Sequence, residues 1–417
     1  MKKSYILIVI ALVSCELFAS GGSVYTRFGL GDIYNNRFAR RMGFGGLGAS
    51  VADAHYIGIY NPAGWYKLGV TRFETGLNVA GIKVRDRTGS SDFSDVSFSG
   101  FAFGFPIDSE YGISIVGGLM PYSKVSYDIR QNTNKLIPGI DTINYNANYY
   151  GNGGLSSVFI GSSYKLPFDF IIGASFSYYF GKIEYNSESD FPDGSVYQDA
   201  YYQRKYSYHG IGTTLGIISS DFSNLFGMES IKDLRLGLVL TYLPKLHTDT
   251  TLLSTSVIGS NSIENGITET KIPIKVGFGV SFIYDEDYLF LIDYLYQPWK
   301  NYEYNNANSR YLRDLQKVSV GFEYENSNPR FDSFWEQIKY RCGLSYEETQ
   351  YRINGVGIDQ YSAFAGITLP VTNMNSIDIG LQYSIRGQTK LNLEKDNYFG
   401  ASVSISLGEL WFIRQER

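Results

Sequence analysis

The sequence predicts an all-β protein, a transmembrane barrel of 14 antiparallel strands with an N-terminal plug segment. In residues 399–408, apolar or small side chains at odd positions alternate with Gly or Ser at even positions. A strand with this pattern has one face suited to lipid and one small polar face suited to a lumen. The alternation recurs in about fourteen segments behind a secretory leader, which together indicate an outer-membrane barrel.

The chain begins with features of a signal peptide. Residues 1–3 are basic after the initiating Met, residues 5–13 carry no charge, and small residues follow at 19–21. The apolar stretch is shorter than the roughly 20 residues that a spanning helix needs. We therefore expect residues 1–20 to be removed on export. Cys15 also fits a lipoprotein site, and that alternative stays open; without Cys15, Cys342 has no partner for an intramolecular disulfide.

Composition excludes some classes of protein. The formal net charge is −5, so the chain lacks the excess of basic residues typical of nucleic-acid-binding proteins. Mean hydropathy is −0.15, but a barrel confines its lipid contact to alternate residues, so its average stays low. The chain has 36 Tyr and 27 Phe, as expected where aromatic side chains line both membrane interfaces. A tyrosine-rich soluble sandwich is the alternative.

Alternation and turn residues together place fourteen strands after a glycine-rich N-terminal segment. They lie near 71–85, 94–106, 111–127, 154–165, 169–186, 200–218, 233–246, 268–284, 287–302, 311–325, 336–350, 358–370, 375–387 and 397–412. Prolines inside these segments predict bulges or bends, because proline cannot donate to a ladder: Pro121, Pro244 and Pro298.

Connection lengths support the barrel. Connections at 108–110 and 285–287 are short, and we expect them on the periplasmic side. The expected outer connections are long, at 128–153, 187–199 and 247–267. Two predicted periplasmic connections, 221–233 and 326–335, are of medium length and fit less well. The even strand count predicts that both termini are periplasmic and that the protein resides in the bacterial outer membrane.

Charged residues on the predicted strands lie opposite the apolar positions. A basic side chain facing lipid near the bilayer midplane costs about 2–4 kcal/mol, so we expect these charges to face the lumen. Six are basic and four acidic, which predicts ion pairs or simple bracing of the lumen more than an ion-selective pore: Arg235, Lys275, Asp293, Lys317, Glu323, Lys339, Arg341, Glu347, Asp378 and Arg386.

The segment before the first strand is rich in glycine and is too long for a simple linker. We expect residues 21–68 to form a plug inside a barrel of residues 69–417. Glycines allow close backbone approach, and Asn-Pro begins a turn. The residues expected to form the plug and its gate are Gly45, Gly46, Gly48, Asp53, Asn61, Pro62, Ala63 and Gly64.

Residues 45–53, followed by Asn61 to Gly64 directly before the first strand, resemble the N-terminal hatch of the FadL-type family of outer-membrane transporters. Residues 25–32 and 408–414 are similar to a divergent branch found in Bacteroidota. The resemblance implies a fourteen-stranded barrel that transports fatty acids or aromatic hydrocarbons. It covers motifs in about 45 residues, no ligand-pocket side chain of the family is matched, and the chain lacks the usual terminal aromatic residue.

The long connection after the third predicted strand is flanked by tyrosines and contains apolar residues. Aromatic rings bind apolar solutes without exact hydrogen bonds, so this region is a candidate hydrophobic-ligand loop, or a loop that simply packs on its neighbours. Its residues are Tyr122, Tyr127, Leu136, Ile137, Ile140 and Tyr149.

The sequence does not predict an enzyme. His55, His209 and His247 are the histidines, and no spacing places one beside a nucleophile. We expect no catalytic residue and no cofactor. We also expect no metal site, because the sequence has no His/Cys cluster and the acidic run 285–287 is typical of a charged turn.

Three functions remain open. The first is plug-gated transport of hydrophobic small molecules, with outer-membrane lipid as the surroundings and no nucleic-acid partner. The second is a non-transporting adaptor that holds a secreted protein, similar to a FadL-like shuttle component of type IX secretion. The third is a structural barrel without transport.

Overall fold

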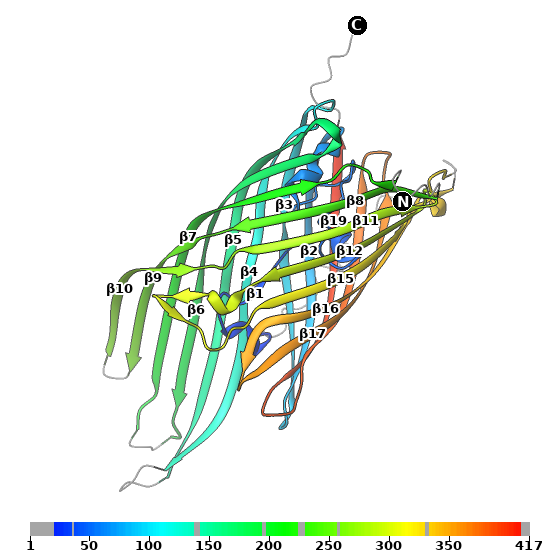
Figure 1. The fold of residues 1–417 in the computed structure, drawn as a ribbon. Helices are drawn as coiled ribbons and strands as arrows, with labels where there is room; N and C mark the ends of the chain where they lie inside the picture. Colours follow the sequence, from blue (N-terminus) through cyan, green and yellow to red (C-terminus); the bar gives the residue numbers. More distant parts are fainter. Residues whose placement is uncertain are drawn as a thin grey trace.

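The structure is a computed structural model that describes residues 21–35, 37–136, 142–193, 197–223, 230–256, 259–329 and 333–409. Its strands form one continuous antiparallel sheet, and the last strand pairs with the first wall strand to close a barrel (Figure 1). No helix in this part of the chain is long and apolar enough to cross a membrane.

Setting aside three strands of two residues, and counting β8/β9 and β10/β11 as one interrupted strand each, leaves fourteen wall strands. The wall consists of β2 (Thr71–Arg85), β3 (Ser90–Asp108), β4 (Ile113–Leu136), β5 (Thr142–Lys165), β6 (Ile171–Asp190), β7 (Ala200–Ile218), β8 (Ile231–Tyr242), β9 (Lys245–Ser256), β10 (Gly259–Lys271), β11 (Lys275–Tyr284), β12 (Tyr288–Gln297), β15 (Leu315–Tyr324), β16 (Lys339–Ile353), β17 (Val356–Pro370), β18 (Ser376–Gly387) and β19 (Lys395–Glu409).

The remaining elements are short. They are η1 (Val24–Arg27), β1 (Asp32–Ile33), α2 (Ala39–Met42), η2 (Pro62–Lys67), η3 (Pro167–Asp169), η5 (Trp299–Asn301), β13 (Glu303–Tyr304), β14 (Ala307–Asn308) and η6 (Phe334–Gln337).

The fourteen wall strands confirm the predicted fourteen-stranded antiparallel barrel. Two predicted strands are each interrupted, at residues 243–244 and 272–274, next to Pro244 and Pro273.

The prediction that the long outer connections are loops is wrong in part, because much of their length forms strands. β4 and β5 stay paired from Ser114 and Ser163 out to Leu136 and Thr142, through most of the predicted connection 128–153. β6 runs on to Asp190, four residues past its predicted end, and β9 and β10 fill most of the predicted connection 247–267, whereas β7 begins at its predicted residue. Figure 1 shows these strands continuing to the lower left beyond the rest of the barrel. These segments carry polar side chains on both faces, so they lack the alternation that marks a strand in lipid. We call them the outer extension.

The two faces of the wall differ as the alternation predicts. On β19, Phe399 is 54% exposed and Leu407 is 43% exposed on the outside of the barrel, whereas Ser402 is fully buried on the inside. The first and last wall strands meet at the rim with the shorter connections, where Thr71 pairs with Glu409. The outer extension lies at the opposite rim.

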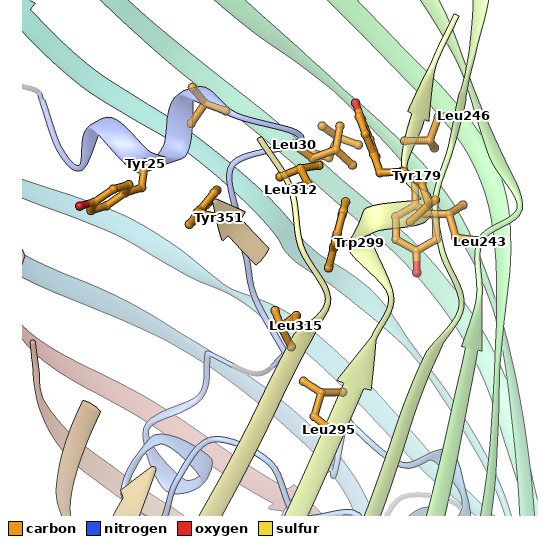
Figure 2. Packing of buried hydrophobic residues seen from close by; sticks show 14 of the residues in the cluster. Tyr25, Leu30, Tyr179, Leu243, Leu246, Leu295, Trp299, Leu312, Leu315 and Tyr351 are labelled. Carbon is orange, nitrogen blue, oxygen red and sulfur yellow. The ribbon is translucent and has the colours of Figure 1, made fainter. Parts of the chain in front are cut away.

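The described residues of the segment 21–68, namely 21–35 and 37–68, lie inside the barrel (blue in Figure 1), and we call them the lumenal segment. The largest cluster of buried apolar residues joins this segment to the wall. Tyr25 and Leu30 pack there with Trp299, Leu312 and Tyr351 (Figure 2). The apolar core is therefore a contact between the N-terminal segment and the outer part of the lumen.

Candidate functional site

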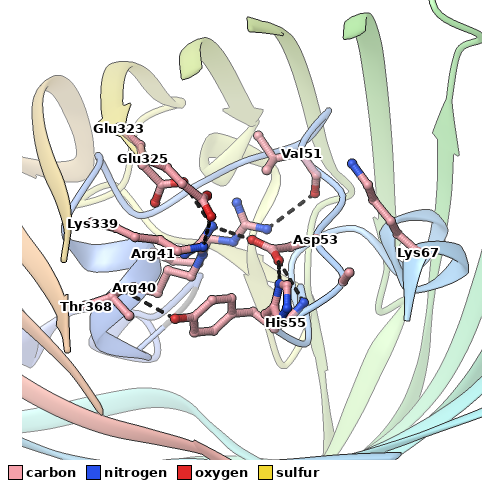
Figure 3. A network of polar contacts seen from close by, with 12 residues as sticks. Arg40, Arg41, Val51, Asp53, His55, Lys67, Glu323, Glu325, Lys339 and Thr368 are labelled. Atoms are coloured by element: carbon pink, nitrogen blue, oxygen red, sulfur yellow. Dashed lines mark hydrogen bonds and ion pairs between the residues drawn. The ribbon is translucent and has the colours of Figure 1, made fainter. Parts of the chain in front are cut away.

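The lumenal segment is attached to the wall by a buried ion network (Figure 3). Arg40 lies on the short helix α2. It is ion-paired with Asp53 and donates to Glu323 of β15 at 3.0 Å. Arg341 of β16 is paired with Glu323 and, at 3.1 Å, with Asp378 of β18. The network joins two parts of the lumenal segment to strands β15, β16 and β18. Removing one member would leave buried charge uncompensated, which costs about 3–5 kcal/mol.

The Asn-Pro-Ala-Gly turn is attached to a different part of the wall. The Asn61 side chain accepts from Ala63 N at 2.9 Å and donates to Ala49 O at 2.5 Å. The side-chain carbonyl of Asn61 lies against Gly216 of β7, where an added Cβ would fall 1.9 Å from the Asn61 Oδ1 atom. Gly216 therefore allows the turn to touch the wall directly. The turn is fixed both to its own segment and to the barrel.

A second anchor lies toward the outer rim. Asp32 accepts from Arg386 at 2.7 Å and from the Tyr351 hydroxyl at 2.8 Å. Ser23 donates to Asp396 at 2.5 Å, and Arg386 also donates to Asp396 at 3.1 Å. The start of the lumenal segment is thus held by wall charges, and its middle is held by the Arg40 network.

Strands β3 and β4 separate partway across the wall. Their pairing runs from Asp108 and Ile113 to Phe101 and Leu119, and bulges follow at Ser99 on β3 and at Tyr122 on β4. Beyond these bulges, in the described residues, β3 pairs with β2 and β4 pairs with β5, but not with each other. We call this unpaired boundary, residues 90–100 of β3 against 120–136 of β4, the seam.

The lumenal segment covers the inner side of the seam. Ile33 and Asp32 pair with Ser123 and Lys124 as the two-residue strand β1 on the free edge of β4. Lys124 bridges to Asp95 of β3 at 2.5 Å. The seam begins within the apolar band of the wall, since the outward-facing Phe98 of β3 is 44% exposed. A short polar seal therefore replaces strand pairing there.

A cavity of about 640 Å³ lies in the outer extension. Its lining includes the η1 end of the lumenal segment and eight tyrosines, with two arginines and no carboxylate: Arg27, Phe28, Gly29, Tyr127, Tyr149, Tyr185, Asn186, Ser187, Tyr202, Arg204, Tyr206, Tyr208, Leu252, Tyr302 and Tyr304. We call it the tyrosine cavity. It falls within the roughly 300–1,000 Å³ typical of small-molecule sites.

The rings of the tyrosine cavity contact one another across several strands. Tyr206 lies 5.8 Å from Tyr185 and 5.5 Å from Tyr304, measured between ring centroids, with both pairs edge to face. Arg27 stacks over Tyr149 at 5.6 Å. Burial, with Tyr206 and Tyr304 adding to it, raises the pKa of Tyr302 well above its usual value, so its hydroxyl stays protonated. The surface offers aromatic faces, hydroxyl donors and positive charge.

Three smaller cavities lie deeper. Two of them, of about 210 and 80 Å³, are both lined by Tyr34, Asn35 and Arg37 and so lie next to each other behind the seam. The third, of about 250 Å³, lies toward the opposite rim beside Asp53 and Lys339. It shares no lining residue with the other two, and the Arg40 network lies beside it.

The structure places the expected plug residues as follows. Gly45, Gly46 and Gly48 have φ of 102°, 82° and 112°, the left-handed region that favours glycine. Gly46 and Gly45 line the 210 Å³ cavity, Asp53 is in the ion network, and Pro62 to Gly64 form the start of η2. They are parts of one attached segment and do not converge on a ligand site.

All ten expected lumenal charges lie on the inner face of the wall. Asp293 accepts from Ala49 N at 2.9 Å, and Lys275 donates to Asn35 at 3.2 Å. The others form ion pairs or contact the lumenal segment: Arg235 with Asp233, Lys317 with Glu347, Lys339 with Glu325, and Glu323, Arg341, Asp378 and Arg386 as described above.

The expected ligand loop is divided by the structure. Tyr127 and Tyr149 line the tyrosine cavity, whereas Tyr122 is partly buried and packs against Tyr179 beside the 80 Å³ cavity. Ile137, Ile140 and the side chain of Leu136 lie outside the described residues. Sequence reasoning missed Arg27, Arg40, Arg204 and the tyrosines of β6 and β7. An arginine pair inside a glycine-rich lumenal segment was a usable signal for Arg40, because buried arginines need carboxylates.

The three histidines lie in two places, His55 in the lumenal segment and the other two on the wall. His55 is half exposed, with its Nδ1 atom 3.9 Å from Asp53. His209 and His247 stack on each other at 5.2 Å on β7 and β9. No group of three or more His, Cys, Asp or Glu residues in the described part of the chain is placed to hold a metal ion.

Fold and site together define an outer-membrane β-barrel whose lumen contains the N-terminal segment of its own chain. The model of the BamG family matches residues 1–416, and the chain belongs to that family. No curated protein matches the sequence.

Among solved structures the fold is that of FadL-type barrels. The CymD monoaromatic hydrocarbon channel is 13% identical, with a TM-score of 0.58 over 90% of this chain and 99% of that one. The toluene transporter TbuX of Ralstonia pickettii is 16% identical, with a TM-score of 0.60 over 90% and 98%. A FadL homologue of Pseudomonas aeruginosa is 12% identical, with a TM-score of 0.56 over 93% and 99%.

Proposed function

We propose that the protein admits hydrophobic small molecules at the outer membrane, with the tyrosine cavity as the first binding site. The observation that carries the proposal is this cavity of about 640 Å³, lined by eight tyrosines, at the outer rim of a barrel with the fold of hydrocarbon channels. Tyrosine rings supply apolar contact area at little cost in side-chain entropy and demand few exact hydrogen bonds. Fatty acids and aromatic hydrocarbons suit such a surface.

On this proposal the lumenal segment is the plug, and its two halves have different roles. The inner half is the fixed floor, because the Arg40 network and the Asn61 turn attach it to several strands. The outer half is the gate. It closes the seam through the two paired residues of β1, through Thr26 and Tyr34, which bond to Ser126 and Tyr122 of β4, and through Arg37, which donates to Ser97 of β3 at 2.7 Å. The Lys124–Asp95 bridge joins β4 to β3 beside these contacts. A ligand would pass from the outer cavities through the seam to the outer leaflet, without displacement of Asn61 to Gly64.

A reversible cross-link tests this route. Ile33 and Ser123 are register partners, so Ile33→Cys with Ser123→Cys, in a Cys342→Ser background, would lock β1 to β4 when oxidised. Uptake of a fluorescent fatty acid into proteoliposomes should stop on oxidation and return on reduction. The control pair Asn132→Cys with Asn146→Cys joins β4 to β5, which are paired permanently, and should leave uptake unchanged. Full uptake through the oxidised seam would overturn the route.

A second candidate is an adaptor barrel that binds another protein without transport. One observation favours it: in the described residues, β10 pairs with β9 along its length but with β13 only at Thr270 and Lys271. The remaining edge of β10 carries unpaired backbone groups, as in edges that accept a partner strand. Ile267 on this edge is 70% exposed.

Site-specific photocross-linking separates the two candidates. A benzophenone side chain at Ile267 in whole cells should give one adduct of defined mass if a partner strand occupies the edge. The same group at Tyr284, which lies at the opposite rim and is 46% exposed, serves as the control position. Absence of a discrete adduct at residue 267, together with uptake that depends on the seam, would exclude the adaptor.

A further inference from the structure

Two buried carboxylates beside the start of the lumenal segment lack enough positive charge. Asp396 is 1% exposed, and its Oδ1 atom has no hydrogen-bond partner among the described residues. The Oε2 atom of Glu394 is likewise buried and without a partner in the described part of the chain. Buried carboxylate oxygens are normally paired, so each unpaired oxygen marks a place where a group is missing.

The nearby cation is already shared. Arg386 serves both Asp32, at 2.7 Å, and Asp396, at 3.1 Å. Glu394 has no ion pair among the described residues, and burial together with Asp396 and Asp86 raises its pKa to about 7. Among the described residues, Arg386 is the basic group ion-paired with the cluster of Asp32, Asp396 and Glu394. Arg37, which lines the same cavity as Asp396, donates to Ser97 at 2.7 Å.

The beginning of the lumenal segment lies against this cluster. Gly21, Gly22 and Ser23 are buried and line the same 210 Å³ cavity as Asp396 and Asp95. Ser23 already donates to the Oδ2 atom of Asp396 at 2.5 Å. Gly22 passes so close to β4 that a Cβ would lie 2.7 Å from Ser126 O. The backbone amine of Gly21 is thus two residues from a side chain that touches Asp396.

We propose that the α-ammonium group of Gly21, released when residues 1–20 are removed, occupies this cavity and forms an ion pair with Asp396. The inference rests on the expected signal peptide and not on the proposed transport. Signal peptidase would hydrolyse the Ser20–Gly21 bond with one water molecule, leaving the carboxylate on Ser20 and the ammonium on Gly21. That ammonium supplies the missing cation and three donors.

The ion pair couples export to the seating of the plug. Before cleavage the nitrogen of Gly21 is a neutral amide, which carries no charge to balance Asp396. After cleavage it fixes the first residues of the lumenal segment beside the seam. Acylation at Cys15 would give a different result, because six further residues would precede Gly21 and its nitrogen would stay an amide.

Chemical labelling of the mature protein tests the proposal. Mass spectrometry of the purified barrel should identify the tryptic peptide 21–27 with a free amine. Reductive dimethylation near neutral pH should label that amine at least tenfold more slowly in the folded barrel than in the urea-unfolded one, because a pKa rise of one unit lowers the free amine about tenfold. Asp396→Asn, which keeps acceptors for Ser23 and Arg386, should restore fast labelling.

A neighbouring carboxylate provides the matched control. Asp92 of β3 is paired with Lys83, and its side chain is 71% exposed, so Asp92→Asn should leave the amine protected. The heat-modifiable gel shift of each variant shows whether its barrel is folded. An N-terminus other than Gly21, an amine that labels at the unfolded rate, or protection that survives in folded Asp396→Asn would each overturn the proposal.

Discussion

Arg40 of the lumenal segment donates to Glu323 of β15 at 3.0 Å, and the two side chains are only 4% and 3% exposed. The pair lies between Asp53 on one side and Arg341 on the other, so a single arginine joins the N-terminal segment to the charge network of the wall. This relationship makes the segment a structural part of the barrel and leads to the first prediction.

Arg40→Gln should destabilise the barrel strongly. It leaves Asp53 with no arginine partner and removes one of the two arginines that pair with Glu323, and the loss of a buried ion-pair partner costs about 3–5 kcal/mol. The free energy of unfolding in urea, measured in lipid vesicles, should fall by that amount, and trypsin should gain access to the lumenal segment. Lys300→Gln breaks an ion pair with Asp314 in which Lys300 is 62% exposed, and should change neither. A variant at Arg40 as stable as wild type would contradict the anchoring role.

Gly216→Ala should displace the Asn61 turn. The added Cβ would fall 1.9 Å from the Asn61 Oδ1 atom, and overpacking of this kind costs about 1–3 kcal/mol. Limited proteolysis of the lumenal segment and the urea midpoint are the measurements. Gly81→Ala is the matched control, because a Cβ there has no heavy atom within 4 Å. Equal behaviour of the two variants would show that the turn does not depend on wall contact.

Tyr206→Ala should weaken binding of an apolar aromatic probe to the tyrosine cavity. Tyr206 contacts the rings of Tyr185, Tyr208 and Tyr304, and each aromatic contact contributes about 0.5–1.5 kcal/mol. Fluorescence titration with N-phenylnaphthylamine should show a Kd raised roughly tenfold. Tyr206→Phe should bind nearly as wild type, and Tyr284→Ala, at the opposite rim, should have no effect. Unchanged affinity in Tyr206→Ala would place the ligand elsewhere.

Lysine substitution should map the lipid boundary. Ile405 on β19 is 40% exposed on the outer face of the wall, so Ile405→Lys should lower the free energy of unfolding in vesicles by about 2–4 kcal/mol. Ile267 is more exposed, at 70%, but lies in the outer extension, where water already surrounds it. Ile267→Lys should therefore be neutral for folding. A large loss at residue 267 would mean that the extension is embedded in lipid.

The sequence predicted the parts of the fold that lipid dictates. Lipid requires strict alternation, so β2 and β18 were placed within a residue of their ends, and the lumenal charges followed from the same parity. Water imposes no such pattern. The polar strands around Asp128 and Tyr150 are held by ladder hydrogen bonds and by neighbouring strands, and nothing in their local sequence distinguishes them from loops.

The candidate site was less predictable because its members come together only through topology. The tyrosine cavity takes Tyr127 from β4, Tyr185 from β6 and Tyr304 from β13. Gly151 of β5 lies between the first two and lets the Tyr127 ring cross it, since a Cβ there would lie 2.3 Å from that ring. The pairing of Ile33 with Ser123 likewise depends on the bulges that open the seam. Contacts between residues so far apart cannot be read from spacing alone.

The last strand also bears on the order in which this barrel folds. Ser404 accepts from Ala39 N at 2.8 Å, while Ser402 and Ser406 donate to the carbonyls of Arg37 and His55 at 3.3 and 2.9 Å. The segment synthesised first is thus bonded to the strand synthesised last, across more than 350 residues. Contacts of such separation in sequence form slowly. We therefore expect β19 to pair with β2 and to bind the lumenal segment in the same late step of folding. A chain without its N-terminal segment would close the barrel without the hydrogen bonds that Ser402, Ser404 and Ser406 make to that segment.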